Sequence, residues 1–384
     1  MLIDEIALTM IPEVGTRTAI HLLECFGSAE AVFSASVGEL VQKAELRQEI
    51  AKIIVRKESH PEAEKELAFA TRNGIRAITP DSPEYPRLLK ECSDYPTVLY
   101  VKGDADLNTP RWLSVVGTRQ ITPYGAKMCE EIISDLAAMF PDTVIVSGLA
   151  FGVDIAAHRA AMNSGLTTIA VVAHALNRIH PVRHTESARR IVNEGGAVVT
   201  EYHTGSEPDK SGFVQRNRII AGLSHGTLIV ESAARGGSLL TADMAGGYNR
   251  CVMAVPGKVG DTYSEGTNNL IKSLKAEMVC SAKDIADVLR WDTPEKTARK
   301  GKGAFREQGL FDAEEGQAAL TASPNLSRKH SELLLALMDA GTPISIDDLS
   351  AQSNIPLNDM SVLLLDLEFG GAVRSLPGKM YIKY

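Results

Sequence analysis

Short apolar runs alternate with amphipathic segments through the middle of the chain, between residues 112 and 291. The apolar runs predict strands at 113–116, 143–146, 167–172, 197–200, 227–230 and 251–255. The amphipathic segments predict helices between most of these strands, at 123–140, 154–163, 184–193 and 238–249. Continuous apolar strands that alternate with helices are typical of a parallel sheet covered on both faces. The expected fold class is therefore α/β, a Rossmann-like doubly wound parallel sheet whose ligands bind beyond the carboxyl ends of its strands.

The segments before this central domain have different patterns. Residues 1–57 predict a domain of short helices around a turn at Val14-Gly15, which resembles a helix-hairpin-helix or SAM-like domain. Such hairpins offer backbone N–H groups to a phosphate, but Glu13 stands where their first glycine is usual, and its charge would repel phosphate. A small helical packing module is the preferred interpretation. Residues 58–111 predict an α/β extension of the central domain, with short strands at 75–79 and 98–102.

The C-terminal part combines a polar segment with a second ordered domain. Residues 292–325 are rich in both signs of charge and in Gly and Ala, and we expect a flexible linker there. Residues 326–384 predict three helices and a hairpin, the order of a winged helix. A DNA-reading winged helix usually has Arg, Lys, Asn or Gln on its third helix. Here that helix has three acids and no Arg or Lys, and the nearby basic residues, Arg374, Lys379 and Lys383, fall in the wing. Contact with protein, or regulation, is the preferred role.

Composition limits the classes of function. The chain has 384 residues and a formal net charge of −8, so a nucleic-acid site would have to be a local patch. The start of the chain lacks the basic region of a signal peptide, and no apolar run approaches the ~18 residues of a membrane span. We therefore expect a cytoplasmic protein without a membrane partner. Five scattered cysteines, none in a CxxC pair, indicate reduced thiols and argue against a structural zinc site.

The stretch 210–241 combines basic, aromatic and glycine residues in an order that suits a polyanion. Its first part has the candidate ligands Lys210, Phe213, Arg216, Asn217 and Arg218. After a buried strand, a glycine turn opens a helix with Gly236, Gly237, Ser238 and Thr241. Such turns present backbone N–H groups and the positive end of the helix dipole to an anion. Cations and an aromatic ring beside the turn indicate single-stranded nucleic acid as the ligand.

Two other strand ends have residues that suit a phosphate. The first central strand is followed by Gly117, Thr118 and Arg119, and the second ends in Ser147 and Gly148. Arg119 is expected at the mouth of the pocket, where a guanidinium can make a bidentate phosphate contact. No G-x-G-x-x-G follows the first strand and no P-loop motif occurs, which argues against a dinucleotide cofactor and a simple ATPase. No cofactor is expected.

Four residues of the 210–241 stretch have a second interpretation. Phe213 is either a platform for a base or an anchor in the core. Arg216 and Arg218 point in different directions on a helix or on an extended chain, so one of them is expected to be structural, and the sequence does not say which. Asn217 is a candidate cap for a helix that contains Ile219.

Two pairs of residues at helical spacing resemble chemical sites. Asp154 and His158 could form an acid–base pair, but a helix cap beside a packing histidine is preferred. His180 and His184 repeat the spacing and lack a third ligand, which argues against zinc.

Six motifs in a fixed order permit a closer comparison. They are VVGTR at 115–119, SGLAFGVDIAAH at 147–158, QRNRIIAGLS at 215–224, GGSLLTADMA at 236–245, AVPG at 254–257 and GTNNLI at 266–271. With the helical N-terminus and the winged helix around them, they resemble the DNA-processing protein A (DprA/Smf) family over the whole chain. The sequence departs from many relatives at AHAL (173–176), at residues 180–184, where they have Tyr-Pro-x-x-Asn, and at Val214, where they often have proline.

The resemblance implies a bacterial cytoplasmic protein that binds and protects single-stranded DNA. It also implies that the protein loads the RecA recombinase onto that DNA, in recombination and natural transformation. Family members form homodimers through the Rossmann-like domain, which makes Leu270 and Ile271 candidates for the dimer face. Members are not known as enzymes.

An enzyme on the same scaffold is the alternative. Nucleotide phosphoribohydrolases share the Rossmann-like architecture, and Glu231 or Glu201 would be the general acid or base. Their PGGxGTxxE signature is absent, since the nearest match, ARGGSLLTA, ends in alanine where the glutamate would be needed. A third function, regulation of a protein partner through the winged helix, is compatible with DNA binding.

Overall fold

A computed structural model describes residues 2–206, 210–291 and 342–353, and beyond them residues 355, 360, 363–364, 367–368, 372–376 and 380–383. The chain divides into two compact units, Met1–Arg299 and Lys300–Tyr384, and each is described by itself. The predicted linker at 292–325 lies outside the described residues.

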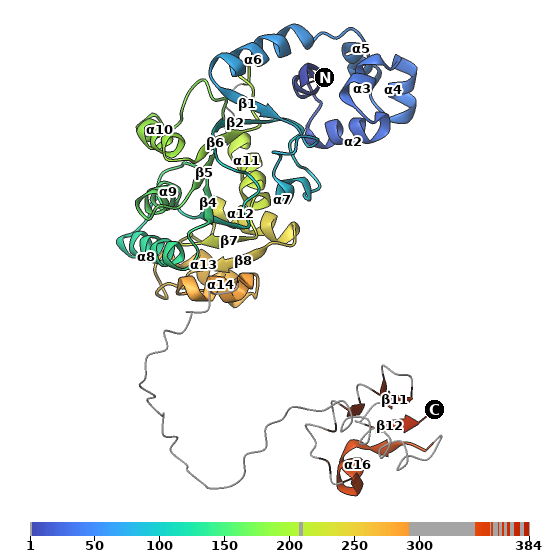
Figure 1. The fold of residues 1–384 in the computed structure, drawn as a ribbon, viewed down its shortest axis with the longest axis vertical. Helices are drawn as coiled ribbons and strands as arrows, with labels where there is room; N and C mark the ends of the chain where they lie inside the picture. The colour runs from blue at the N-terminus through green and yellow to red at the C-terminus, as the bar shows by residue number, and fades with distance from the viewer. Residues whose placement is uncertain are drawn as a thin grey trace, which may run out of the picture. The chain divides into compact units, whose positions relative to one another are not determined.

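The first unit contains a run of helices followed by alternating strands and helices (Figure 1). The N-terminal helices are α1 (Leu2–Thr9), α2 (Thr16–Phe26), α3 (Ala29–Ser34), α4 (Val37–Lys43), α5 (Gln48–Val55) and α6 (His60–Arg72). They are followed by β1 (Ile75–Ile78), α7 (Arg87–Lys90) and β2 (Leu99–Gly103). The central part consists of β3 (Arg111–Val116), α8 (Pro123–Met139), β4 (Thr143–Ser147), α9 (Val153–Asn163), β5 (Thr168–Val171), a 3-10 turn (Val182–His184), α10 (Thr185–Asn193), β6 (Ala197–Thr200), α11 (Lys210–Gly222), β7 (Gly226–Ile229), α12 (Gly237–Gly247), β8 (Cys251–Ala254), α13 (Glu265–Lys272), β9 (Glu277–Met278) and α14 (Ala282–Leu289).

The nine strands described in this unit form one sheet, in the order β1-β2-β6-β5-β4-β3-β7-β8-β9. The strands from β3 to β9 pair in parallel, whereas β2 pairs antiparallel with both β1 and β6. The chain winds outward from β3 through β4, β5 and β6, and then starts again on the other side of β3 with β7. The predicted doubly wound α/β fold is confirmed, and its winding reverses between β3 and β7.

Helices cover both faces of the sheet, with α8, α9 and α10 on one side and α11 and α12 on the other (Figure 1). Alternate residues of β3 show the two faces: Trp112 and Val116 pack toward α11 and α12, and Leu113 and Val115 toward α8 and α9. Because both faces of the strand are buried, its sequence is apolar at nearly every position. The buried polar residue of the strand, Ser114, donates a 2.6 Å hydrogen bond to the carbonyl oxygen of Ile220 in α11.

The N-terminal helices share an apolar cluster with α6, β1 and β2. The cluster contains Ile6 of α1, Leu22 of α2 and Ile54 of α5, together with Ile75 of β1 and Tyr100 of β2. The segments before and after residue 57 therefore pack into one core at the β1–β2 edge of the sheet.

The start of α11 differs from the expectation. The helix begins at Lys210, well before the apolar residues near position 219 that predicted it. Asn217 therefore lies inside the helix, and its predicted role as a cap is wrong. The first two turns lack apolar residues at helical spacing, so tertiary packing and not local sequence determines where the helix starts.

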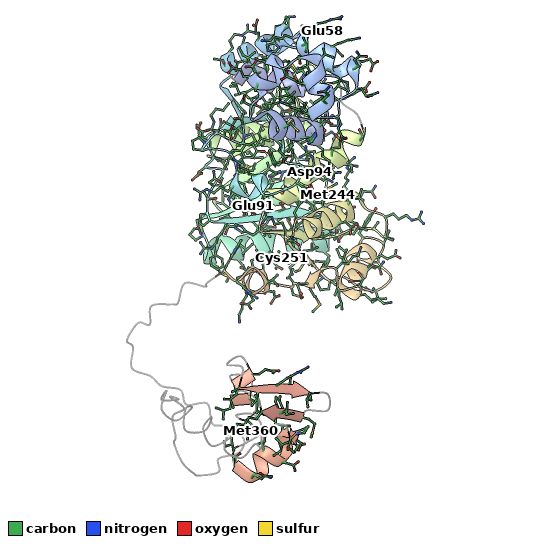
Figure 2. All side chains as sticks on the ribbon, turned by 90° about the vertical axis from the view of Figure 1, so that its right-hand side faces the viewer. Glu58, Glu91, Asp94, Met244, Cys251 and Met360 are labelled. Carbon is green, nitrogen blue, oxygen red and sulfur yellow. The ribbon has the colours of Figure 1, made fainter. Side chains whose placement is uncertain are left out.

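The described part of the second unit is small. It contains β10 (Ile344–Ser345), α16 (Ile346–Ser353), β11 (Val373–Leu376) and β12 (Met380–Lys383), with the strands in the order β10-β12-β11. Leu349 of α16 and Val373 of β11 pack with the buried Met360, which Figure 2 labels. The predicted hairpin is present as β11 and β12, whereas Lys379 and most of the predicted first and third helices lie outside the described residues.

Candidate nucleic-acid interface

A cleft of about 400 Å³ opens at the point where the winding of the sheet reverses. The carboxyl end of β3, the start of α9, one side of α11 and the start of α12 surround it. The lining residues are Val116, Gly117, Thr118, Arg119, Ala150, Asp154, Phe213, Val214, Arg216, Asn217, Ile220, Ala233, Arg235, Gly236, Gly237, Ser238 and Thr241. This is where doubly wound sheets bind their ligands, because neighbouring crossovers leave the sheet in opposite directions there.

The turn after β3 is held tightly by its neighbours. The Thr118 N–H donates to the Glu231 carbonyl oxygen (2.7 Å), and the Val153 N–H donates to the Thr118 carbonyl oxygen (3.1 Å). A Cβ atom on Gly117 would lie 2.8 Å from the Glu231 carbonyl oxygen, so only glycine permits this approach. The backbone of Arg119 is therefore fixed, while its side chain is exposed at the cleft.

Arg119 and Arg235 are the cations best placed to meet a ligand. Both are exposed and line the cleft, and neither forms an ion pair with any carboxylate of the described chain. The guanidinium carbon of Arg119 lies 5.6 Å from the ring centroid of Phe213, which is half-buried. An unpaired guanidinium beside an accessible ring offers a phosphate contact next to a surface for a base.

The start of α12 adds backbone donors to the same cleft. Gly236 is the N-cap residue, and no side chain caps the helix there. The Ser238 hydroxyl donates inward to Ser232 Oγ (2.9 Å), so it stabilises the turn. The first N–H groups of an uncapped helix favour an anion, and anion binding at this glycine turn stays a prediction.

Arg216 lies beneath the cleft and is almost fully buried. Its Nη1 atom donates to the carbonyl oxygens of Gly148 (2.7 Å) and Val171. Asp154 lies close to it, and burial raises the pKa of Asp154 although the Arg216 charge acts in the opposite direction. Arg216 therefore joins α11 to the ends of β4 and β5.

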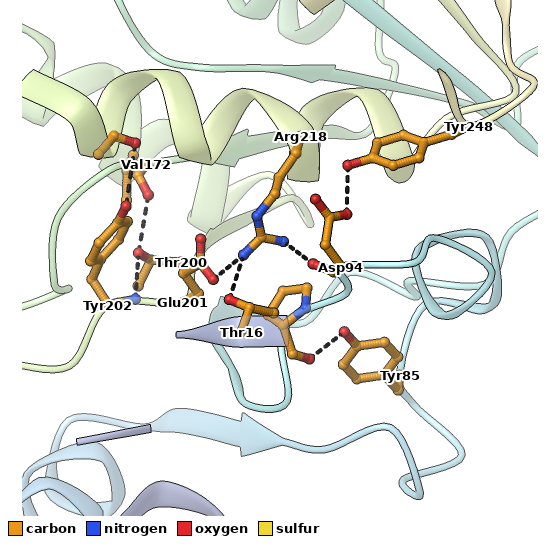
Figure 3. A network of polar contacts seen from close by, with 11 residues as sticks. Thr16, Tyr85, Asp94, Val172, Thr200, Glu201, Tyr202, Arg218 and Tyr248 are labelled. Carbon is orange, nitrogen blue, oxygen red and sulfur yellow. Dashed lines mark hydrogen bonds and ion pairs between the residues drawn. The ribbon is translucent and has the colours of Figure 1, made fainter. Parts of the chain in front are cut away.

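Arg218 does not line the cleft and belongs to a separate polar network (Figure 3). It forms an ion pair with Glu201 and donates to the Asp94 carbonyl oxygen and, at 3.2 Å, to Thr16 Oγ1. Tyr248 donates to the Asp94 carboxylate at 2.6 Å in the same network. The expected DNA contact of Arg218 thus has no place in this cleft, because the guanidinium joins α11 to the N-terminal helices.

Three other predicted ligands have no described side chain in the lining of the cleft. Ser147 is fully buried and donates to the Val115 carbonyl oxygen (2.6 Å). Gly148 lies against Arg216, whose guanidinium occupies the space that a side chain would need. The side chain of Lys210 lies outside the described residues. Arg235 was missed by the prediction, although its position directly before Gly236-Gly237 was a usable signal.

The two glutamates of the enzyme alternative have structural partners. Glu231 accepts hydrogen bonds from the backbone N–H (2.9 Å) and the hydroxyl (2.5 Å) of Thr122 at the start of α8. Glu201 is paired with Arg218. Within the described lining, Asp154 is the one carboxylate, so the cleft does not offer a pair of acids for hydrolysis. No cluster of metal-ligating side chains and no helix able to cross a bilayer occur among the described residues.

The predicted dimer residues face their own chain. Leu270 is buried in the cluster beneath α11 and α12, and Ile271 packs against that cluster. Leu270 is therefore not available as a surface contact. The exposed apolar side chains nearby are Leu274, which is 93% exposed, and Met278.

Comparison with known proteins identifies the family. Residues 76–290 match the family described as DNA recombination-mediator protein A, and residues 317–379 match the DprA winged helix domain. The chain belongs to the DNA recombination-mediator protein A family. The predicted resemblance to DprA/Smf proteins and the predicted winged helix are both confirmed.

Similarity to other members of the DprA family extends along most of the chain. Protein Smf of Escherichia coli (strain K12) is 34% identical over 315 residues, which is 82% of this chain and 79% of the relative. The DNA processing protein DprA of Streptococcus pneumoniae (strain R6) is 40% identical over 201 residues, 52% of this chain and 70% of the relative.

Two solved structures of DprA proteins have a similar fold. The X-ray structure of DprA from Streptococcus pneumoniae has a TM-score of 0.64 at 30% identity and covers 74% of this chain and 95% of its own. The structure of DprA from Helicobacter pylori, described for its single-stranded DNA binding mode, has a TM-score of 0.51 at 28% identity and covers 57% of this chain and 97% of its own.

Proposed function

We propose that the cleft between β3 and β7 binds single-stranded DNA and that the protein delivers this DNA to the RecA recombinase. The main support is the juxtaposition of the unpaired Arg119 and Arg235 with the Phe213 ring and the uncapped start of α12. Guanidinium groups and helix N–H groups bind phosphates, and the ring takes a base whatever its identity. The description of the Helicobacter pylori relative as a single-stranded DNA binder agrees with this.

Fluorescence anisotropy with a labelled oligothymidine and its duplex, at two salt concentrations, tests DNA binding. We expect tight, salt-sensitive binding of the single strand, because phosphate contacts dominate such complexes. Arg119→Ala should weaken binding about 10- to 100-fold, as expected for a charged hydrogen bond. Arg159→Ala removes an exposed arginine of α9 outside the cleft and serves as the matched control. Equal affinity of the Arg119→Ala variant and the wild type would refute the site.

Delivery to RecA is supported by the family's description as a recombination mediator. RecA hydrolyses ATP on single-stranded DNA, so its lag on DNA that is coated with single-strand-binding protein reports loading. The wild type should shorten the lag and the Arg119→Ala variant should not. An unchanged lag with the wild type would leave a DNA binder without a loading function. We assign this activity to the cytoplasm and to natural transformation, and the five free cysteines agree with a reducing compartment.

We also propose that the protein forms a homodimer whose two chains meet near β9. β9 lies at one end of the described sheet, and apolar surface is exposed by Met278 in β9 and by Leu274 shortly before it. Light scattering coupled to gel filtration should give twice the chain mass for the wild type and a lower mass for Leu274→Asp. A monomeric wild type would refute the dimer.

A further inference from the structure

The loop between β5 and α10, residues 173–184, lies beside the proposed DNA cleft. The ring of His180 lies 6.1 Å from the ring of Phe213, at an angle of 59°. His180 is exposed, so this contact does not bury its ring in the core. The loop therefore presents a second aromatic surface next to the first.

Two buried histidines hold the loop in place. The backbone N–H of His180 donates to His174 Nε2 (3.1 Å), and His174 Nδ1 donates to the Ala175 carbonyl oxygen (2.9 Å). At the other end, His184 Nδ1 donates to the Leu149 carbonyl oxygen (2.7 Å). His184 also meets the ring of Phe151 edge-on at 4.8 Å. Because the first contact uses the backbone of His180, its side chain remains available to a ligand.

The surface between these two anchors combines apolar and basic side chains. Val182 is 78% exposed, and Phe151, which contacts His184, is 44% exposed. Arg183 is exposed and forms no ion pair within the described part of the chain. The protein as a whole has a net charge of −8, so this unpaired cation stands out. Together with the exposed apolar side chains it forms a surface that suits a nucleotide, with the base on the apolar side chains and the phosphate on the cation.

A groove of about 500 Å³ continues from the same loop toward α10. Its lining includes Ile179 and Leu176 together with Arg178, Arg189 and Lys102. The groove next to this loop therefore also combines cations with apolar side chains.

We infer that His180 stacks on a second base, next to the one on Phe213, and that Arg183 contacts a phosphate as the strand leaves the cleft over this loop. The inference rests on the proposed function and extends the proposed DNA site over the loop at residues 173–184. Exchange of His180 for alanine should weaken binding of a long oligothymidine about 5- to 100-fold, the usual range for one stacked base. His180→Tyr retains a ring and should retain the affinity.

The experiment places one 2-aminopurine at successive positions of an oligothymidine, since stacking on an aromatic side chain changes its fluorescence. We expect two responsive positions with the wild type, one lost with Phe213→Ala and the other with His180→Ala. His21→Ala, an exposed histidine of α2, is the matched control, and thermal unfolding checks that each variant is folded.

The outcomes separate the two proposals. If His180→Ala leaves both the affinity and the responsive positions unchanged while Arg119→Ala weakens binding as expected, the inference is wrong and the proposed function stands. If the wild type binds no single strand, the proposed function fails and the inference fails with it. Loss of affinity with both His180→Ala and His180→Tyr would also overturn stacking, because the ring is present in the second variant.

Discussion

Arg216 and Arg218 stand two positions apart in α11 and serve different parts of the molecule. Arg216 bonds to carbonyl oxygens at the ends of β4 and β5, beneath the cleft. Arg218 bonds to Glu201, Asp94 and Thr16 on the far side. Two residues advance a helix by about 200°, so the side chains of Arg216 and Arg218 leave the helix on nearly opposite sides. Sequence could predict this divergence, but not which arginine pointed where.

Arg218→Ala should destabilise the protein without a direct effect on DNA. The change leaves the Glu201 carboxyl, whose side chain is 13% exposed, without its partner, and desolvation already raises the pKa of that group. The expected loss in the free energy of unfolding is roughly 3 kcal/mol. Urea denaturation measures it, and Arg218→Ala with Glu201→Gln should recover part of it. Normal stability together with lost DNA binding would show that Arg218 contacts DNA after all.

His158 should make stability depend on pH. Its Nδ1 donates to Thr168 Oγ1 (2.7 Å) while Nε2 is buried without a partner, near Arg216 and His184. Burial lowers the pKa of His158 to about 3, so the folded protein keeps the neutral form. The unfolded chain takes up a proton below its pKa of about 6.5. Stability is therefore full above that pH and falls by up to about 1.4 kcal/mol per unit as pH drops from there toward 3.

The test compares urea denaturation of the wild type and His158→Gln between pH 7 and pH 4. The variant should have a shallower dependence, although other buried histidines, such as His174, retain part of it. Identical slopes would mean that His158 does not titrate between the two states.

At the scale of elements, the turn after β3 determines where Arg119 stands. Gly117→Ala would place a Cβ 2.5 Å from Val153 Cγ2 and 2.8 Å from the Glu231 carbonyl oxygen, so the turn must move. We expect a loss of about 1–3 kcal/mol in stability and weaker binding of single-stranded DNA, although Arg119 is retained. Gly246→Ala in α12 is the control, since a Cβ there meets nothing within 4 Å and Gly246 does not line the cleft. Anisotropy and urea denaturation give both quantities, and equal behaviour of the two variants would refute the role of the turn.

The central strands and most of their helices could be predicted to within about two residues. Buried parallel strands such as β3 and β7 require apolar residues on both faces, so each is an apolar run bounded by polar turns. The start of α11 could not be predicted, because Lys210 to Asn217 have no apolar spacing and contacts with distant strands fix that part of the helix. The glycine turn before α12 was visible because glycines mark it. The buried hydrogen-bond partners of Ser147 and Arg218 could not be predicted, because partners such as Val115 and Asp94 are far away in the sequence.

At the scale of the whole molecule, a local patch on a protein with net charge −8 should make few phosphate contacts. Affinity for a single strand changes with salt with a slope of about 0.7 per phosphate contact. Arg235→Ala should lower the measured slope by about 0.7 in a series of anisotropy titrations. Arg159→Ala should leave it unchanged. An unaltered slope in the Arg235→Ala variant would remove Arg235 from the interface.

The two compact units predict a simple truncation. A chain that ends at Arg299 retains every lining residue of the cleft. We expect it to bind oligothymidine with the affinity of the full chain. Loss of binding in a folded fragment would assign the DNA site to the winged helix, whose wing includes Arg374.

The reversal of winding between β3 and β7 means that the two walls of the cleft come from separate halves of the chain. Arg119 stands in the half that builds β3 to β6, and Phe213 and Arg235 stand in the half that follows. A strand that contacts both walls adds a further link between the two halves. A ligand that binds only the folded state stabilises it by an amount that grows with the logarithm of the ligand concentration relative to Kd. The bound strand therefore makes the protein harder to unfold. On the proposed function, the protein is therefore most resistant to unfolding while single-stranded DNA occupies the cleft.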